Sequence, residues 1–242
     1  MKLDILAFGV HPDDVELGCA GSLIIAVSEG KKVGVVDLTQ GELGTRGTVH
    51  TRKEEADAAA KIIGLAVREN LNMRDGFFVN DEQHQLKIIS CIRKYRPDIV
   101  ICNAPEDRHP DHGRASRLVV ESCFYAGLSK IKTQHNELEQ DPWRPKNVFH
   151  YLQDRFLQPD FLVDISKVFD KKLNAIKAYS TQFYNPDISG PETYISTPEF
   201  LDTLIGRYKL LGKTIGVAYA EGFITQKTVG LRSLSDIIHM VT

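Results

Sequence analysis

The chain has 242 residues, with 30 Lys and Arg against 32 Asp and Glu and a formal net charge of -2. This length suits one large α/β domain, and the 42% of hydrophobic residues is enough for a sizeable core. The near-neutral charge argues against nucleic acid or an anionic membrane as a partner. Because no apolar run reaches the ~18 residues of a membrane span, we expect no membrane segment.

The N-terminus and the cysteines bear on the cellular compartment. Met1 leads directly into a strand pattern, without the apolar region and cleavage site of a signal peptide. The four cysteines have no CxxC spacing and fall in or beside apolar segments, at Cys19, Cys91, Cys102 and Cys123. They therefore suggest buried thiols in a reducing compartment, and we expect a cytoplasmic protein.

The first half of the chain alternates strand and helix patterns. Apolar runs predict strands at residues 3–10, 31–39, 67–71 and 99–102. Helical spacing predicts helices at residues 16–28, 51–63, 81–95 and about 111–126, with Thr51 and Glu54 as a capping box for the second. This rhythm predicts a Rossmann-like, mostly parallel sheet with helices on both faces. No GxGxxG follows the first strand, which argues against a dinucleotide site.

The second half continues the pattern less regularly. Residues 130–144 are polar and predict a surface loop or a short helix. Beyond them, strands are expected at residues 148–152, 161–165 and 216–225, and helices at 168–179 and 197–211. With no internal repeat or linker, the second half is expected to be a C-terminal extension of one domain spanning residues 1–242.

The first chemical motif follows the first predicted strand, in residues 9–16. A rigid strand end is a good place for a metal site, because it holds the ligands while the loop beyond stays open to substrate. His11 and Asp14 are close enough to share a cation, and Asp13 between them would face a water. Taken alone, the motif is equally well explained by a helix N-terminus capped by Asp13 or Asp14.

The second motif, residues 103–112, follows the fourth predicted strand. Catalytic zinc usually has three protein ligands and one open position, and His112 in the first helical turn is the best third ligand. Asp111 would cap the helix or orient an imidazole. Alone, the motif is equally a polar turn, but two such motifs at strand ends favour a metal site. Four other histidines suggest structural or solvated roles: His50, His84, His135 and His239. His150 lies in a predicted strand and would face either the core or the site.

These residues resemble the PIG-L/LmbE-like zinc N-deacetylases. The matching features are residues 11–14 (HPDD), residues 109–112 (HPDH), the loop 39–47, and Arg52 with Glu55. The continuation through residues 14–21 resembles the bacillithiol-biosynthesis branch, which deacetylates N-acetylglucosaminyl malate, and residues 179–182 and 220–223 are similar too. One departure is Val15, where many members have the acidic residue of HPDDE.

The resemblance implies roles for the motif residues. Zinc would be held by His11, Asp14 and His112, Asp13 would act as general base, and His109 would lie near the reacting carbonyl. Asp111 is expected to keep His109 oriented and protonated. The family fold is Rossmann-like, and branch members are often oligomeric, so a homo-oligomer is expected.

A malate aglycone would bring two carboxylates, which suit guanidinium groups. Arg52 and Arg108, beside the two metal loops, are the candidates, while Arg46 and Glu42 would line the sugar side. The alternative for all four is an ordinary surface charge. Tyr194 lies in residues 185–197, a possible lid, where it would either reach the oxyanion or serve packing.

Three other functions compete with deacetylation of N-acetylglucosaminyl malate. The first is a deacetylase of another N-acetylated sugar or small amide. The second is a metal-dependent phosphoesterase, although two-metal enzymes usually need more clustered carboxylates than this sequence offers. The third is a binding module with a structural metal, which would need a fourth Cys or His ligand near the site.

Overall fold

The structure, a computed structural model, describes residues 1–237, so His239 lies outside the described residues. Its strands are β1 Ile5–Gly9, β2 Val33–Thr39, β3 Val67–Met73, β4 Ile99–Cys102, β5 Gln134–His135, β6 Leu138–Glu139, β7 Asn147–Tyr151, β8 Phe161–Asp164 and β9 Ala220–Thr225. Its helices are α1 Asp14–Ser28, α2 Val49–Ile63, α3 Glu82–Tyr95, α4 Pro110–Tyr125, α5 Phe169–Lys177 and α6 Pro198–Thr214, with short 3-10 helices η1 Ser166–Val168 and η2 Leu234–Asp236.

One sheet of seven strands organises the fold, in the order β3-β2-β1-β4-β7-β9-β8. The first five of these strands pair in parallel, and β9 pairs antiparallel with both β7 and β8. The predicted mostly parallel α/β fold is therefore confirmed. β2 is buried along its whole length, as expected for a parallel strand covered on both faces.

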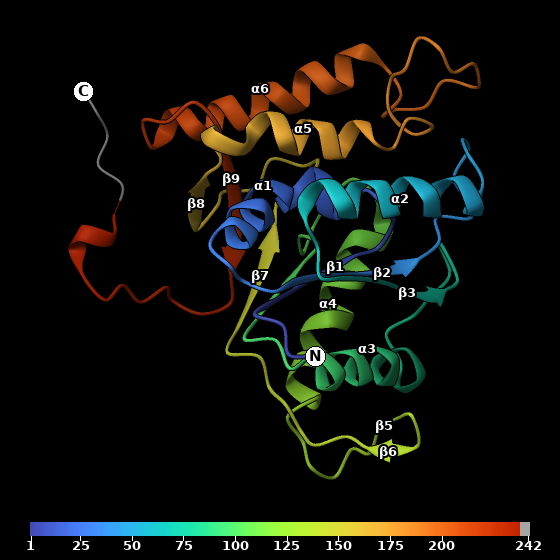
Figure 1. The fold of residues 1–242 in the computed structure, drawn as a ribbon, viewed down its shortest axis with the longest axis vertical. Helices are drawn as coiled ribbons and strands as arrows, with labels where there is room; N and C mark the ends of the chain where they lie inside the picture. The colour runs from blue at the N-terminus through green and yellow to red at the C-terminus, as the bar shows by residue number, and fades with distance from the viewer. Residues whose placement is uncertain (238–242) are drawn as a thin grey trace.

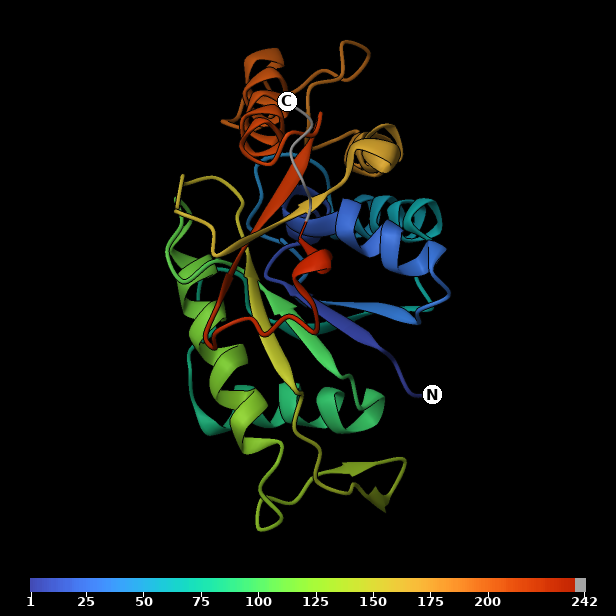
Figure 2. The ribbon, with the colours of Figure 1, turned by 90° about the vertical axis from the view of Figure 1, so that its left-hand side faces the viewer.

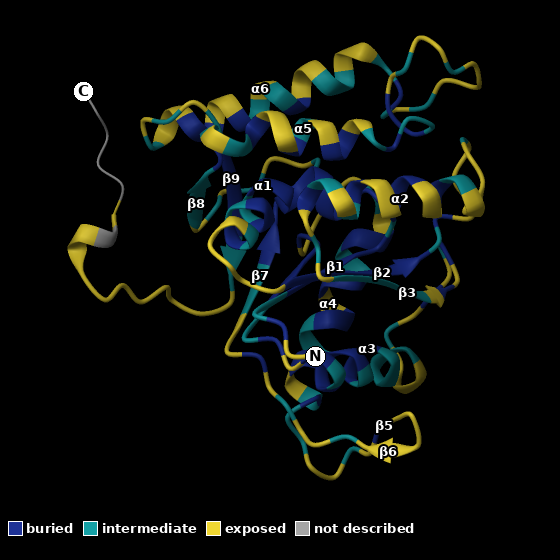
Figure 3. Ribbon diagram, in the orientation of Figure 1, coloured by how far each residue is buried: buried dark blue, intermediate teal, exposed yellow. Residues whose placement is uncertain are grey.

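Helices cover both faces of this sheet (Figure 1). α1 and α2 lie on one face and α3 and α4 on the other, while α5 and α6 form a further layer outside α1 and α2. Turned by 90°, the molecule shows α6 at one end and the β5–β6 hairpin at the other (Figure 2). The central strands β1, β2 and β4 and the inward faces of the helices are mostly buried, and exposure is concentrated on the outer helix faces, the loops and the β5–β6 hairpin (Figure 3).

Two local predictions were wrong. α2 begins at Val49 rather than at residue 51, because Thr48 caps it: the Thr48 side chain accepts from the Thr51 amide, and the Thr51 hydroxyl accepts from the Thr48 amide. The capping box is thus one turn earlier than the predicted Thr51–Glu54 pair. Within residues 130–144 the structure has the β5–β6 hairpin, whose turn residues Asn136 and Glu137 both have positive φ. That turn lacks the Asn-Gly signature that marks such hairpins in a sequence.

The described part of the chain, residues 1–237, has no helix that combines the length and apolar character needed to cross a membrane.

Candidate active site

The candidate site lies where five parallel strands end at the same edge of the sheet, the usual ligand position in open α/β sheets. Each strand, or the loop that follows it, contributes side chains: β1 gives His11, Asp13 and Asp14; β2 gives Arg46; β3 gives Asp75; β4 gives Asp107, His109 and His112; and β7 gives Gln153. All of these side chains except Asp107, which contacts His112, line a pocket of about 360 Å³. The two motifs that the sequence singled out therefore meet, as predicted.

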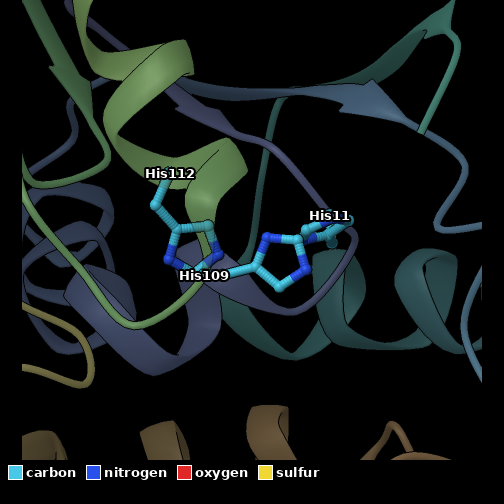
Figure 4. Close-up of side chains that lie close together, drawn as sticks. All are labelled: His11, His109 and His112. Carbon is cyan, nitrogen blue, oxygen red and sulfur yellow. The ribbon is translucent and has the colours of Figure 1, made fainter. Parts of the chain in front are cut away.

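Three histidines converge on one point (Figure 4). His11 comes from the β1–α1 loop, His109 precedes α4, and His112 lies in its first turn. Their ring centroids are 4.7 Å apart for His11 and His109, 5.2 Å for His109 and His112, and 5.8 Å for His11 and His112. One nitrogen from each ring lies within 4.8 Å of the others, so the three side chains are close enough to hold a metal ion.

Carboxylates hold two of these rings in place. The Oδ1 atom of Asp75 is 2.9 Å from Nε2 of His11, and Oδ2 of Asp107 is 2.6 Å from Nδ1 of His112. Such partners select a histidine tautomer and leave the second nitrogen for a cation. We missed both carboxylates from the sequence. Asp75 does follow a strand end, and that position is a signal that would have found it.

Asp14 is a buried carboxylate with a full set of partners. Its Oδ2 atom accepts from the backbone amides of Val10 and His11, both at 3.0 Å, and from the Asn103 side chain at 3.1 Å. Its Oδ1 atom is 3.3 Å from Nε2 of His112. Burial opposes ionisation, but the charges and hydrogen bonds of His112 and His11 outweigh it and hold the pKa of Asp14 well below its usual range. Asp14 is therefore ionised at neutral pH.

The pKa of the neighbouring Asp13 is shifted in the opposite direction. Burial raises its pKa to about 7, even though the Arg52 guanidinium, 2.9 Å away, favours the charged form. Its backbone φ of 130° is unusual for a residue with a side chain, and such strain is concentrated at functional sites. Asp13 occupies the N-cap position of α1 without making a side-chain cap bond. The helix-cap explanation of this residue is therefore not supported.

His109 is held in one tautomer by its own helix. As N-cap of α4, its Nδ1 atom accepts from the Asp111 amide at 3.3 Å. Burial, followed by the charges of His11 and His112, lowers the pKa of His109. A neutral ring that accepts at Nδ1 carries its proton on Nε2.

The Asp111 carboxylate contacts neither nitrogen of His109. Instead it accepts from the Gly76 amide at 2.9 Å and pairs with Arg114 at 2.7 Å. Asp111 therefore orients His109 through its backbone amide and not through its carboxylate, and the lowered pKa of His109 disagrees with the expected protonated ring. Through these two bonds, the carboxylate joins the loop after β3 to α4, while only the backbone amide of Asp111 contacts His109.

The structure distributes the predicted substrate residues differently. Arg52 is buried and bonded to Asp13 and to Oε1 of Gln182, both at 2.9 Å, so its charge is committed to the Asp13 carboxylate. Arg108 lines the pocket with a half-exposed side chain; its Nε atom lies 3.4 Å from Asp154 and its guanidinium 4.1 Å from the ring centre of Tyr194. Arg108 is therefore the predicted guanidinium that remains accessible to a ligand.

Two of the remaining three predicted residues, Arg46 and Tyr194, line the pocket. Arg46 lines the pocket and donates to the backbone carbonyls of Thr181, Ile188 and Pro191, so it braces the later loop. Glu42 accepts from the Asp75 amide at 2.7 Å and is not among the pocket-lining residues of the described chain. Tyr194 lines the pocket but is 55% exposed, with its hydroxyl 3.4 Å from Asp154.

Known proteins resemble this chain in sequence and structure. The family PIG-L (GlcNAc-PI de-N-acetylase) matches residues 6–123. The diacetylchitobiose deacetylase of Thermococcus kodakarensis is 31% identical over 90% of this chain and 81% of its own length. A probable N-acetyl-α-D-glucosaminyl L-malate deacetylase 2 of Bacillus cereus is 28% identical over 75% of this chain and 84% of its own.

Two solved structures show the same fold. The conserved protein TT1542 from Thermus thermophilus has a TM-score of 0.85 and 36% identity, covering 96% of this chain and 98% of its own. The N,N'-diacetylchitobiose deacetylase from Pyrococcus horikoshii has a TM-score of 0.76 and 25% identity, covering 92% and 83%.

Fold and site together define an α/β enzyme with a buried histidine and carboxylate cluster at the carboxyl ends of its strands. The chain belongs to the PIG-L family, and it is an N-deacetylase of N-acetylated sugars.

Proposed function

We propose that the chain is a zinc-dependent deacetylase whose cation is held by His11, Asp14 and His112. Two imidazoles and one carboxylate are a common donor set for catalytic zinc, with one position left open. The carboxylate partners of the two rings and the ionised state of Asp14 support this set. The single observation that carries the proposal is that His112 lies beside both Asp14 and Asp107, which joins the two sequence motifs.

His109 is the competing third or fourth ligand, since it belongs to the same cluster of histidines. Its tautomer argues against that role, because the ring that accepts at Nδ1 presents an N–H, not a lone pair, at Nε2. We assign His109 the task of donating this N–H to the carbonyl oxygen as negative charge develops there.

Asp13 is the proposed general base. Zinc supplies Lewis acidity that polarises the carbonyl and acidifies water. Asp13 takes the proton of the attacking water and afterwards passes it to the leaving amine. The raised pKa of Asp13, about 7, is close to the range in which a carboxylate does both tasks. Arg52 keeps that carboxylate ionised and oriented before the reaction.

N-acetylglucosaminyl malate is the proposed substrate within the N-acetylated sugars. The Bacillus relatives, which are probable N-acetyl-α-D-glucosaminyl L-malate deacetylases, support it. Arg108 at the pocket also supports it, because a malate carboxylate suits a guanidinium. A neutral disaccharide is the second candidate. The named activity of the Thermococcus relative favours it, as does the commitment of Arg52 to Asp13, which removes one of the two guanidinium groups expected for malate.

Metal analysis combined with an assay for primary-amine release tests these proposals. The substrates are N-acetylglucosaminyl malate, diacetylchitobiose and N-acetylglucosamine. One zinc per chain with the highest kcat/KM for the malate conjugate supports the proposal. A preference for diacetylchitobiose would overturn the malate assignment and keep the deacetylase. Bound zinc without amine release from any acetylated sugar would contradict deacetylation altogether.

We also propose a reducing, cytoplasmic location, because all four cysteines are free thiols and buried. The expected homo-oligomer stays a prediction that gel filtration with light scattering tests.

A further inference from the structure

Two adjoining spaces lie at the histidine cluster and share part of their lining. One is the open pocket of about 360 Å³ described above. The other is a small, more enclosed cavity of about 20 Å³ that His109 and His112 also line. A cavity of this size holds one water-sized group. Any substrate whose reacting carbon lies at the histidines can therefore place a large substituent in one space and only a very small one in the other.

Apolar side chains form one side of the small cavity, and its other lining residues are polar: Arg108, His109, His112, Gln153 and Asp154. Leu17 of α1 and Leu204 of α6 are buried in one hydrophobic cluster, and Ile195 and Phe200 pack against the same cluster. These walls belong to packed helices and to the segment leading into α6, so the cavity cannot enlarge without moving core side chains. The apolar side of the cavity and its one-group volume match a methyl group.

One polar group at this cavity lacks a partner. Gln153 is 8% exposed and lines both the cavity and the open pocket. Its Nε2 atom donates to Oδ1 of Asp14 at 2.6 Å. Because a carboxylate only accepts, this bond determines which end of the amide is nitrogen. The other end, Oε1, is buried and has no hydrogen-bond partner among the described residues. A buried acceptor without a donor is costly, which points to a donor supplied by a ligand.

An acetamido group has a methyl group that would fit the cavity and an N–H that would fit the unpaired Oε1 atom of Gln153, and both lie on the same edge of the amide. In a trans amide the N–H points away from the carbonyl oxygen, to the side on which the methyl lies. We propose that the small cavity is the acyl subsite of the enzyme: the methyl fills the space between Leu17, Ile195 and Leu204, and the amide N–H donates to Oε1 of Gln153. The sugar then occupies the open pocket. This inference rests on the proposed deacetylase function and adds that the chain is selective for acetyl among acyl groups.

An acyl-length series tests the cavity. N-acetyl, N-propionyl and N-butyryl glucosaminides are compared by amine release at equal zinc loading. One additional methylene in a closed apolar pocket reduces kcat/KM by roughly 10-fold to 200-fold, so the wild type should lose at least about 10-fold from acetyl to propionyl. Leu204→Ala opens the cavity and should raise the propionyl-to-acetyl ratio by about 10-fold or more. Leu210→Ala, an exposed position on the same helix, should leave the ratio at the wild-type value.

Ile195→Ala provides a second enlarging variant outside the helix, in case Leu204→Ala does not fold. It should raise the same ratio. The cavity is not the acyl subsite if the wild type accepts butyryl as readily as acetyl, or if both folded enlarging variants keep the wild-type ratio. Amine release from none of the acyl substrates would overturn the proposed function together with this inference, whereas release with unchanged ratios overturns the inference alone.

A matched pair of substrates tests Gln153. An O-acetyl ester places the same methyl beside an oxygen that cannot donate, so it lacks the partner for Oε1. Gln153→Met removes the acceptor, and any disturbance of Asp14 affects both substrates alike. The amide-to-ester ratio of kcat/KM should therefore fall by about 10-fold in Gln153→Met, the scale of one lost buried hydrogen bond. An unchanged ratio would show that Gln153 acts only through Asp14.

Discussion

The two sides of the pocket are built from different parts of the chain and do different tasks. The loops after β1, β3 and β4 carry the groups that we propose bind the cation and move protons, and each follows a strand of the parallel part of the sheet. The opposite wall, from Gln153 to Leu204, comes from the region after β7 and carries the contacts that sort substrates. Changes at the groups that bind the cation or move protons should therefore alter kcat for every substrate. Changes at the groups that contact the rest of the substrate should alter the order of preference among substrates.

The largest effect is expected at Asp13, on the side of the pocket that carries the cation-binding and proton-moving groups. Asp13→Asn should retain zinc and reduce kcat by about 100-fold to 10,000-fold, the range for a general acid–base group. The exposed Asp57→Asn on α2 is the matched control and should be unchanged. Zinc analysis and steady-state kinetics measure both. Near-normal turnover of zinc-loaded Asp13→Asn would remove Asp13 from the reaction.

The same variant has a pH signature. Asp13 must be ionised to accept a proton, so activity falls as the pH drops through its pKa. Burial raises that pKa to about 7 in the metal-free protein, and a bound cation opposes the shift. The acid limb of kcat/KM is therefore expected below pH 7 in the zinc enzyme. It should disappear in Asp13→Asn, and its survival there would assign it to another group.

A smaller effect is expected at His109. Loss of one oxyanion donor costs about 100-fold to 1,000-fold in kcat, so His109→Ala should lose activity on this scale and keep its zinc. His84→Ala, near the start of α3, is the control and should match the wild type. If zinc content falls with His109→Ala, His109 is a ligand and the cluster of three histidines is the metal site.

The next smaller effect is expected at Asp107, the carboxylate partner of His112. Asp107→Asn removes the carboxylate that orients this ring and should weaken zinc affinity by about 10-fold to 100-fold. Activity should return at saturating zinc, since the ligands themselves remain. Competition with a chelator measures the affinity. Unchanged affinity would mean that Asp107 is not needed to orient His112.

The smallest effect is expected at Arg108, which belongs to the loop after β4 but contacts Tyr194 and Asp154 of the opposite wall. Arg108→Ala should raise KM for N-acetylglucosaminyl malate by several-fold, with little change for N-acetylglucosamine, because an exposed charge pair contributes modestly. Arg117→Ala, an exposed arginine on α4, controls for the change in net charge. Equal effects on both substrates would exclude Arg108 from carboxylate recognition.

The sequence predicted the groups that bind the cation and move protons far better than the wall that contacts the substrate. His11 and Asp14 come just after one apolar strand and His112 begins the helix after another, and parallel strands of one sheet bring such ends together. Asp75 was not predicted although it follows a strand end, and Gln153 was not predicted because its contact with Asp14 depends on how distant segments pack. Arg52 shows the same limit: its charge was visible in the sequence, but its burial against Asp13 was not.

The parallel sheet was predictable for a similar reason, since alternating strands and helices leave few other arrangements. The antiparallel placement of β9 between β7 and β8 was not, because an apolar run does not state its direction.

The most direct test of the central claim is zinc-dependent amine release from an N-acetylglucosaminide by the wild type and by His112→Ala. The wild type should lose activity on removal of the metal and regain it with one zinc per chain, whereas His112→Ala should bind zinc far more weakly and release no amine. Full deacetylation by the metal-free wild type, or by His112→Ala, would contradict the account.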